Sequence, residues 1–499
     1  MGKFLDKLVE FANVTETENG DKAYKSTLNG IYDMFGRAGT MRDEYDENEC
    51  VTLFTNAFND NPLYAIRLLF YIRDVRGGQG VKYFFRKVMV YLAKNEPKLT
   101  CALVDYIPEY GSWKDIIDLL SYSDGYSAMV ENYIVNKIGS QLVQDGKNIL
   151  EGKNISLLAK WMPSENTSSH ETRMLAKKLR IALNLNSKDY RKMLSKYRAH
   201  LNVVETKMCA NTWDGIKYET VPSKAMQNYS NAFTRHDEIR FNQYLDSVKT
   251  GKTKINAKTL YPYDLIHQLQ KDLADSKTIE AQWNALPDYF AGKKDNSIVV
   301  ADVSGSMFGN PIEVCISLAL YIAERNKGEF HNKFITFSAS PNLQSIKGNS
   351  LIQKLTSIES SDWGMNTDLD AVFQLLYNAA EQTNVEDLPS TIYIISDMQF
   401  DDCMENGNKT TFEKWQKKFG LELGKPLPRV VFWNVSNYAT FPITVHNSGA
   451  ILVSGFSPSI LKYVMEDKIS DGRELLEEIV NSDRYKNILS TEELHKLIG

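Results

Sequence analysis

Cysteine is scarce in this 499-residue chain, and its few cysteines are scattered. Their number is odd and no two form a Cys-x-x-Cys pair, which argues against a disulfide framework and against a zinc site. Reduced thiols are typical of the cytosol, so we expect a cytoplasmic protein. The five cysteines are Cys50, Cys101, Cys209, Cys315 and Cys403.

Long apolar runs are also absent from the sequence. No run of about 18 apolar residues occurs, so we expect no membrane-spanning helix. The first residues, Met1 to Lys7, lack the apolar core of a signal peptide, and the positions after Gly2 do not fit a myristoylation signal. Hydrophobic residues make up 43% and charged residues 24% of the chain, as in soluble globular proteins.

Histidine gives no sign of catalysis. The seven histidines are isolated in the sequence, and their spacing shows no His-Asp-Ser arrangement. Each is explained more simply as a surface residue or a hydrogen-bonded core residue than as a catalytic base. The sequence therefore favours a binding protein over an enzyme.

The net charge is small, −5, but it is unevenly distributed. Residues 291–499 carry 19 Lys and Arg against 27 Asp and Glu, whereas residues 171–260 carry 18 against 8. A local basic excess marks either a segment that faces nucleic acid or the solvated faces of several helices.

The first 290 residues are predicted to form an all-helical domain. From about residue 50 onward, apolar residues recur at helical spacing. Short breaks indicate stacked antiparallel helix pairs, as in HEAT-like repeats, although no clean sequence repeat is present. The expected helices span residues 63–71, 81–93, 126–144, 153–161, 170–184, 187–199, 236–248, 260–272 and 277–289, with another starting at Ser112.

The pattern changes near residue 290, where short apolar runs begin to alternate with helices. The runs are rich in β-branched and aromatic residues, as expected of strands buried on both faces of a mainly parallel sheet. This alternation predicts a doubly wound α/β domain over residues 291–499. The expected strands are 298–301, 334–337, 392–395, 430–433 and 451–453, and the helices are 311–326, 368–382, 410–420, 457–467 and 472–482.

Two of these strands run into a carboxylate. Asp302 follows the first strand and begins the sequence Asp-Val-Ser-Gly-Ser-Met, and Asp397 follows the third strand. Ligands of open α/β sheets lie beyond the carboxyl ends of the strands, so the two carboxylates share one rim if their strands are parallel neighbours. Ser304, Ser306 and Thr367 would add hydroxyl oxygens, giving a site for Mg²⁺ or Mn²⁺.

Two carboxylates and three hydroxyls carry little negative charge, which leaves a bound ion electrophilic. Such an ion can accept an acidic oxygen from a partner, either a carboxylate or a phosphate. The nearby carboxylates Asp368, Asp401 and Asp402 could also take part. A phosphatase would need a second acid two residues after Asp302, where Ser304 stands instead.

In this order, the Asp-x-Ser-x-Ser, Thr and Asp elements resemble the metal-ion-dependent adhesion site of von Willebrand A domains. The resemblance implies that Asp302, Ser304, Ser306, Thr367 and Asp397 hold Mg²⁺. The third loop departs from the common Asp-Gly form, because Asp-Met stands there in this sequence. Because of this departure, the resemblance implies Asp397 as a ligand but does not indicate which residues surround it.

From about residue 60 to near its C-terminus, the chain resembles a two-domain family of unknown function that joins a helical region to a von Willebrand A-like domain. The architecture is similar to that of the Ro autoantigen, whose TROVE helical ring binds small and misfolded RNAs. This analogy implies RNA as the partner of the helical domain. The matching stretches are Leu69–Gly80 (LFYIRDVRGGQG), Tyr110–Trp113, Val300–Met307, Ile395–Asp401 and Val453–Ser457.

The RNA prediction has its own candidate residues. The glycine-rich loop at 76–80 is either a phosphate-binding loop or the glycine end of a helix, since it follows a helix and lacks a Gly-Lys-Ser/Thr sequence. In the basic segment, aromatic residues (Tyr190, Tyr197, Trp213, Tyr218 and Tyr229) either stack on single-stranded RNA or form a core beneath solvated basic faces. The candidate contacts are Arg73, Arg76, Lys177, Lys178, Arg180, Arg191, Lys192, Lys196 and Arg198.

We therefore expect a non-enzymatic scaffold that binds an acidic ligand through Mg²⁺ and RNA through its helices. A protein–protein adaptor without RNA is the alternative. A metal-dependent phosphoester hydrolase is the third possibility, and it would need a general base near the ion, for which Asp401 and Asp402 are the nearby candidates.

Overall fold

The computed structural model describes residues 8–9, 11–43, 45–121, 125–293, 296–361, 363–364, 366–402, 409–465 and 469–498. None of the helices in these ranges combines the length and the hydrophobicity needed to span a lipid bilayer. The cysteines Cys50, Cys101, Cys209 and Cys315 are free thiols, while Cys403 lies outside the described residues.

Apart from a short antiparallel hairpin of β1 (Val14–Glu16) and β2 (Lys22–Tyr24), the regular structure described up to residue 290 is helical, as predicted. Helix starts follow the local sequence: Asn61 caps α4 through the N–H of Tyr64, and Pro62 takes the first helical position. The helices are α2 (Gly30–Arg37), α3 (Glu47–Asp60), α4 (Pro62–Arg73), α5 (Tyr83–Asn95), α6 (Pro97–Val104), α7 (Ile107–Tyr110), α8 (Trp113–Ser121), α9 (Ala128–Leu150), α10 (Leu158–Trp161), α11 (His170–Ala182), α12 (Ser187–Leu201), α13 (Val204–Cys209), α14 (Ser223–His236), α15 (Glu238–Lys249), α16 (Pro262–Gln270) and α17 (Ser276–Asn284).

The C-terminal domain is built on a six-stranded, mostly parallel sheet with the order β5-β4-β3-β6-β7-β8. All five expected strands are present, and the short edge strand β5, which runs antiparallel to β4, was not predicted. Strand β4 lies on one side of β3, and β6 lies on the other side. The strand order therefore reverses between β3 and β6, which is the switch point where open α/β sheets bind ligands. The strands are β3 (Ser297–Ala301), β4 (Lys333–Thr336), β5 (Leu343–Ser345), β6 (Thr391–Ser396), β7 (Arg429–Asn434) and β8 (Ala450–Ser454).

Helices from both parts of the chain cover this sheet. Helix α18 (Asn310–Arg325) packs on β3, β4 and β6, whereas β8 is covered by α23 (Gly472–Val480) and by α2 from the N-terminal part. The remaining helices of the domain are α19 (Leu351–Glu359), α20 (Leu369–Glu381), α21 (Thr411–Lys418), α22 (Leu461–Val464) and α24 (Thr491–Ile498).

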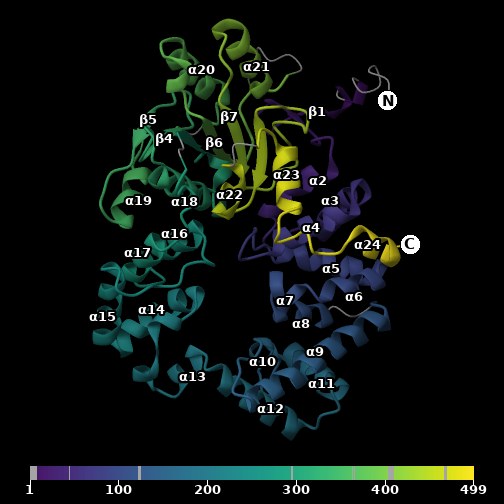
Figure 1. Ribbon diagram of the computed structural model, residues 1–499. Coiled ribbons are helices and arrows are strands. Elements are labelled where there is room, and N and C mark those ends of the chain that lie inside the picture. Colours follow the sequence, from purple (N-terminus) through teal and green to yellow (C-terminus); the bar gives the residue numbers. More distant parts are fainter. Residues whose placement is uncertain are drawn as a thin grey trace.

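The helical part leaves the α/β domain on one side and returns to it on another, so the chain follows a closed circuit (Figure 1). At one end α2 packs on β8 and α4 on α23, and at the other end α16 packs on α18. The Trp283 indole N–H reinforces the second junction by donating to Glu324 at 2.6 Å. Both ends of the helical arc are therefore fixed to the same domain.

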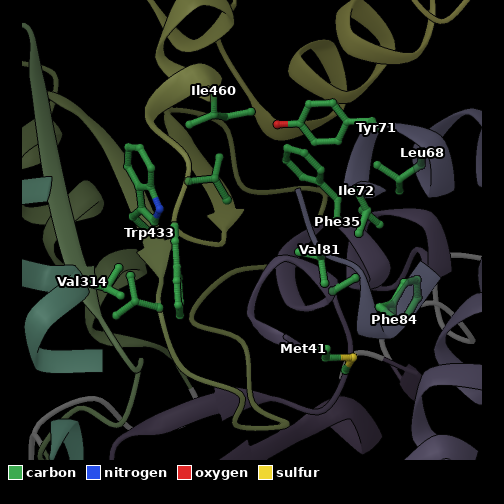
Figure 2. Close-up of a cluster of buried hydrophobic side chains, with 14 of the residues drawn as sticks. Phe35, Met41, Leu68, Tyr71, Ile72, Val81, Phe84, Val314, Trp433 and Ile460 are labelled. Carbon is green, nitrogen blue, oxygen red and sulfur yellow. The ribbon is translucent and has the colours of Figure 1, made fainter. Parts of the chain in front are cut away.

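A continuous apolar core joins the first helices to the sheet. Figure 2 shows Phe35, Tyr71 and Ile72 of the helical part in the same cluster as Trp433 and Ile460 of the C-terminal domain. Each of these side chains is buried, and burial of a large apolar side chain stabilises a fold by about 1.5–3 kcal/mol. A smaller, separate core holds α13, α14 and α15 together around Phe233 and Phe241.

Candidate metal site

The first loop of the candidate site begins where β3 ends. Asp302 is completely buried, and its backbone N–H donates to the carbonyl of Ile395 at 3.1 Å, which extends the pairing of β3 with β6. Its carboxylate accepts hydrogen bonds from the Ser304 N–H at 2.9 Å and from the Ser396 hydroxyl at 2.6 Å. The hydroxyls of Ser304 and Ser306 lie 3.1 Å apart. The loop therefore turns back over the carboxylate.

Asp397 enters the same rim from the end of β6. Its carboxylate is buried, and one oxygen accepts the N–H of Gln399 at 3.0 Å. The other oxygen, Oδ2, has no hydrogen-bond partner in the described part of the chain, although the Ser306 hydroxyl lies near enough to favour the ionised form. A buried carboxylate oxygen without a partner is energetically costly, and a cation bound beside it would offset that cost.

The charge of Asp397 also affects Asp302. Burial and the charge of Asp397 raise the pKa of Asp302 to about 7, and burial raises the pKa of Asp397. The main opposing effects come from hydroxyls and backbone N–H groups, and no cationic side chain is prominent among them. A divalent cation would supply the missing positive charge.

Thr367 lies on the adjacent loop but points to other partners. Its hydroxyl is buried, 2.8 Å from the carbonyl of Gln399 and 2.9 Å from a carboxylate oxygen of Asp401, and its N–H donates to the other Asp401 oxygen at 3.0 Å. Thr367 is thus hydrogen-bonded to Gln399 in the loop after β6, and Gln399 in turn donates its N–H to Asp397. Of the other candidate acids, Asp368 caps α20 through the N–H of Ala371.

The donor chemistry matches a site rich in hydroxyls rather than one rich in charge. Across the described ranges, no group of three or more His, Cys, Asp or Glu side chains is arranged to hold a metal. Two carboxylates with hydroxyls and water would instead provide the oxygen ligands that Mg²⁺ prefers. Ser306 is exposed, so this ligand set opens to solvent on one side.

Sequence reasoning missed one part of the site, the turn of the N-terminal hairpin. The N–H of Glu18 donates to the side-chain oxygen of Gln399 at 2.8 Å. The Asn19 amide donates to the Gln399 carbonyl at 2.8 Å and to the Thr367 hydroxyl at 3.1 Å. No local motif marks this turn, because its role arises only from its position in the folded chain.

Two of the candidate nucleic-acid contacts lie in or near the glycine-rich loop. The Arg73 guanidinium is buried and donates twice to Asp115, at 2.6 and 3.1 Å, so the prediction that it contacts phosphate conflicts with its position. Arg76 is exposed and donates to the carbonyl of Glu109 at 2.7 Å. The loop follows α4, whose C-cap is Asp74 in an extended conformation, so no glycine ends this helix; Gly80, with a φ of 66°, lies six residues further on.

The basic candidates of α11 and α12 divide into structural and exposed residues. Arg180 pairs with Glu165 at 2.8 Å, Arg198 donates to three oxygens around residues 159–164, and Lys178 pairs with Glu131 at 3.0 Å. The aromatic residues Tyr190 and Tyr218 are buried in cores. The exposed candidates on these helices are Lys177, Arg191, Lys192 and Lys196.

Comparison with known proteins agrees with this two-part architecture. Residues 17–133 and 176–291 match a domain of unknown function, DUF2828, and residues 296–496 match another, DUF7788. These matches define a two-domain protein with a helical N-terminal part and an α/β C-terminal part. The chain is 32% identical to uncharacterized protein L728 of Acanthamoeba polyphaga mimivirus, over 91% of this chain and 85% of that protein, and it belongs to the same family.

Proposed function

We propose that this protein is a non-enzymatic, cytoplasmic binding scaffold with a von Willebrand A-like domain that binds an acidic partner through Mg²⁺, which Mn²⁺ could replace. The observation that carries the proposal is the buried Oδ2 of Asp397, which has no partner in the described chain beside the equally buried Asp302. A bound ion would supply positive charge and an open coordination position. Asp302 and Asp397 would hold it, with Ser304, Ser306 and Thr367 as neutral oxygen ligands, directly or through water.

The arrangement supports binding better than hydrolysis. A hydrolase needs a base free to take a proton near the ion. Asp401 already accepts hydrogen bonds from both the N–H and the hydroxyl of Thr367, which gives it a structural role. The backbone of Asp402 is bonded to the N-terminal turn, where its N–H donates to the carbonyl of Asn19 at 3.1 Å.

Calorimetric titration with Mn²⁺ and Mg²⁺ tests the metal site directly. The wild-type protein should take up one ion per chain, and Asp397→Asn, which removes a charge at nearly constant volume, should lose that uptake. Asp387→Asn is the matched control, because this exposed carboxylate lies before β6, at the opposite rim of the sheet. Equal uptake by the wild type and Asp397→Asn would overturn the proposal.

For the helical part we propose RNA as the partner, in keeping with its resemblance to HEAT-like and TROVE-like domains. The exposed basic residues on α11 and α12 support this proposal, because their side chains are free to contact phosphates. Such phosphate contacts make the affinity for RNA fall steeply as the salt concentration rises. Filter binding of single-stranded and structured RNA should show tight binding at low salt that weakens at high salt.

A double variant identifies the RNA-binding surface. Lys192→Ala with Lys196→Ala should weaken RNA binding and reduce its salt dependence, whereas Lys327→Ala with Lys347→Ala, two exposed lysines of the α/β domain, should not. No binding by the wild type at low salt would refute the RNA proposal. Capture of a protein that is lost with EDTA and resists nuclease would instead favour an adaptor without RNA.

A further inference from the structure

A pocket with a volume of about 300 Å³ lies where segments that are far apart in the sequence meet. Its walls come from the glycine-rich loop after α4, the segments before α16 and after α17, and the turn after β8. The pocket is therefore built from both parts of the chain. It shares no residue with the proposed metal site.

The glycine-rich loop and the turn after β8 are held together by hydrogen bonds. The Ser459 hydroxyl donates to the carbonyl of Gly78 at 3.0 Å, and the Ser457 hydroxyl donates to that of Ser459 at 2.9 Å. Both serine side chains are buried. Only glycine fits at position 78, because a Cβ there would lie 1.9 Å from the carbonyl oxygen of Tyr71. The fold therefore fixes the shape of this wall.

The residues that line the pocket include two cations, Arg76 and Lys258, and no acid. Both are exposed, so their side chains are accessible to a ligand. The Arg76 guanidinium donates through Nη1 to the carbonyl of Glu109, which leaves its other N–H groups available in the described part of the chain. The pocket therefore offers positive charge and N–H donors to an anion.

The carboxylates near these walls are bound to other groups. Asp74, at the start of the glycine-rich loop, pairs with Arg484 and accepts the hydroxyl of Tyr485 at 2.9 Å. Asp288, in the segment after α17, accepts the N–H of Phe290 at 2.9 Å. Neither aspartate lines the pocket, so no acid competes there with an anionic ligand for the two cations.

The remaining walls are mostly apolar and aromatic. Leu260 and Leu286 line the pocket together with Tyr261 and Tyr289. The Tyr261 hydroxyl lies beside Gly80, is buried and has no hydrogen-bond partner in the described chain. A buried polar group of this kind is completed by a ligand or a water molecule. The pocket thus combines a cationic side with flat apolar surfaces.

We propose that this pocket binds the 5′-phosphate end of a nucleotide. Arg76 and Lys258 contact the phosphate, which accepts charge-assisted hydrogen bonds from such cations. The apolar and tyrosine-lined walls cover the sugar and the base, since every base has a flat face that stacks on aromatic rings. The volume lies at the lower end of the range for small-molecule pockets, which suits a single nucleotide. The proposal depends neither on the metal site nor on the basic residues of α11 and α12.

Calorimetric titration of the full chain with the four ribonucleoside 5′-monophosphates, each compared with its nucleoside, tests the pocket. At least one monophosphate should bind, and its nucleoside should bind about tenfold more weakly or worse, because the charge-assisted contacts are lost. Arg76→Ala with Lys258→Ala should weaken binding of the monophosphate by about tenfold or more. The matched control is Arg235→Ala with Lys252→Ala, two exposed cations of the helical part that do not line the pocket.

Two RNA oligonucleotides of one sequence, with a 5′-phosphate or a 5′-hydroxyl, distinguish a free nucleotide from an RNA end. Tighter binding of the phosphorylated strand, lost in Arg76→Ala with Lys258→Ala and kept in the control, identifies the ligand as an RNA end. Equal binding of the two strands, with pocket-dependent binding of a monophosphate, identifies a free nucleotide. If neither the monophosphates nor the 5′-phosphate bind in a way that depends on Arg76 and Lys258, the pocket is not a nucleotide site.

Discussion

Asp302 is the residue whose surroundings say most about the site. Its carboxyl group is completely buried, and burial together with the charge of Asp397 raises its pKa to about 7. In the absence of a cation, Asp302 therefore takes up a proton near neutral pH, which lowers the negative charge of the pair by one. A metal ion and a proton should compete for this residue.

This competition predicts an unusual dependence of stability on pH. Because the pKa of Asp302 in the folded protein lies above its ordinary value of 3.8, the folded state holds the proton more tightly than the unfolded chain does. The metal-free protein should therefore lose stability as pH rises from about 4 to about 7, with Asp302 contributing about 2 kcal/mol of loss between pH 5.5 and 7.5.

Thermal unfolding in EDTA at these two pH values measures the loss. The variant Asp302→Asn, whose amide does not titrate, should show a loss smaller by the contribution of Asp302. Mg²⁺ should stabilise the wild type more at pH 7.5 than at pH 5.5, because fewer protons then compete with the ion. A pH response that is the same in the two proteins would show that Asp302 does not titrate in this range.

Four of the five site residues could be placed by reasoning on strand ends. Asp302, Ser304, Ser306 and Asp397 follow strands that the structure shows to be parallel neighbours, so their meeting follows from topology alone. Thr367 lies nearby, but its hydroxyl is bonded to Gln399 and Asp401, which sequence alone could not indicate. The part played by the N-terminal turn was beyond prediction, because it depends on long-range packing.

Met398 explains how the third loop departs from the common Asp-Gly form. Its φ of 66° is left-handed, a backbone conformation that glycine adopts freely and that costs other residues about 1–2 kcal/mol. The Met398 side chain is buried, and that burial offsets the cost. The loop therefore places a methionine in a conformation for which glycine is the usual residue.

At the scale of elements, the short apolar runs rich in β-branched and aromatic residues predicted the sheet well. The five expected strands are almost entirely buried, and their short β-branched runs leave little ambiguity. The short strand β5 was missed because its three residues, Leu343–Ser345, are polar or exposed and lie at the sheet edge. Helix α14 was missed, although its apolar residues Met226, Tyr229 and Phe233 recur at helical spacing.

One ion-pair cluster ties three helices together. Asp115, near the start of α8, is buried and pairs with Arg73 at the end of α4 and with Arg86 in α5. Burial alone would raise the pKa of Asp115, but the two guanidinium groups outweigh this effect and lower it. The cluster therefore fixes the relative positions of these helices.

Removal of one arginine of this cluster should lower the free energy of unfolding. Arg73→Ala leaves the buried Asp115 carboxylate only partly compensated, so it should destabilise the protein by about 3–5 kcal/mol in chemical unfolding. Arg76→Ala is the matched control, because Arg76 is exposed and should change stability by less than about 1 kcal/mol. An Arg73→Ala protein of unchanged stability but weaker RNA binding would restore Arg73 as a phosphate contact.

At the scale of the whole molecule, packing crosses the sequence boundary near residue 290. The edge strand β8 belongs to the α/β domain, yet α2 of the N-terminal part covers it. The Ser454 hydroxyl donates to the Phe35 carbonyl, and the Leu452 N–H donates to the Tyr32 hydroxyl, both at 2.6 Å. The α/β part therefore depends on the first residues of the chain for its covering.

This dependence predicts how fragments behave. Residues 291–499 alone should unfold at a lower temperature than the full chain and bind a hydrophobic dye, because an edge strand and the apolar surface under Tyr32 and Phe35 become exposed. Fusion of residues 8–43 to this fragment should restore much of the lost stability, since each of these two side chains contributes about 1.5–3 kcal/mol when buried. The same fusion carrying Tyr32→Ala and Phe35→Ala is the control and should restore little. A fragment of residues 291–499 that matches the full chain in unfolding temperature would mean that the N-terminal segment lies on the α/β domain without stabilising it.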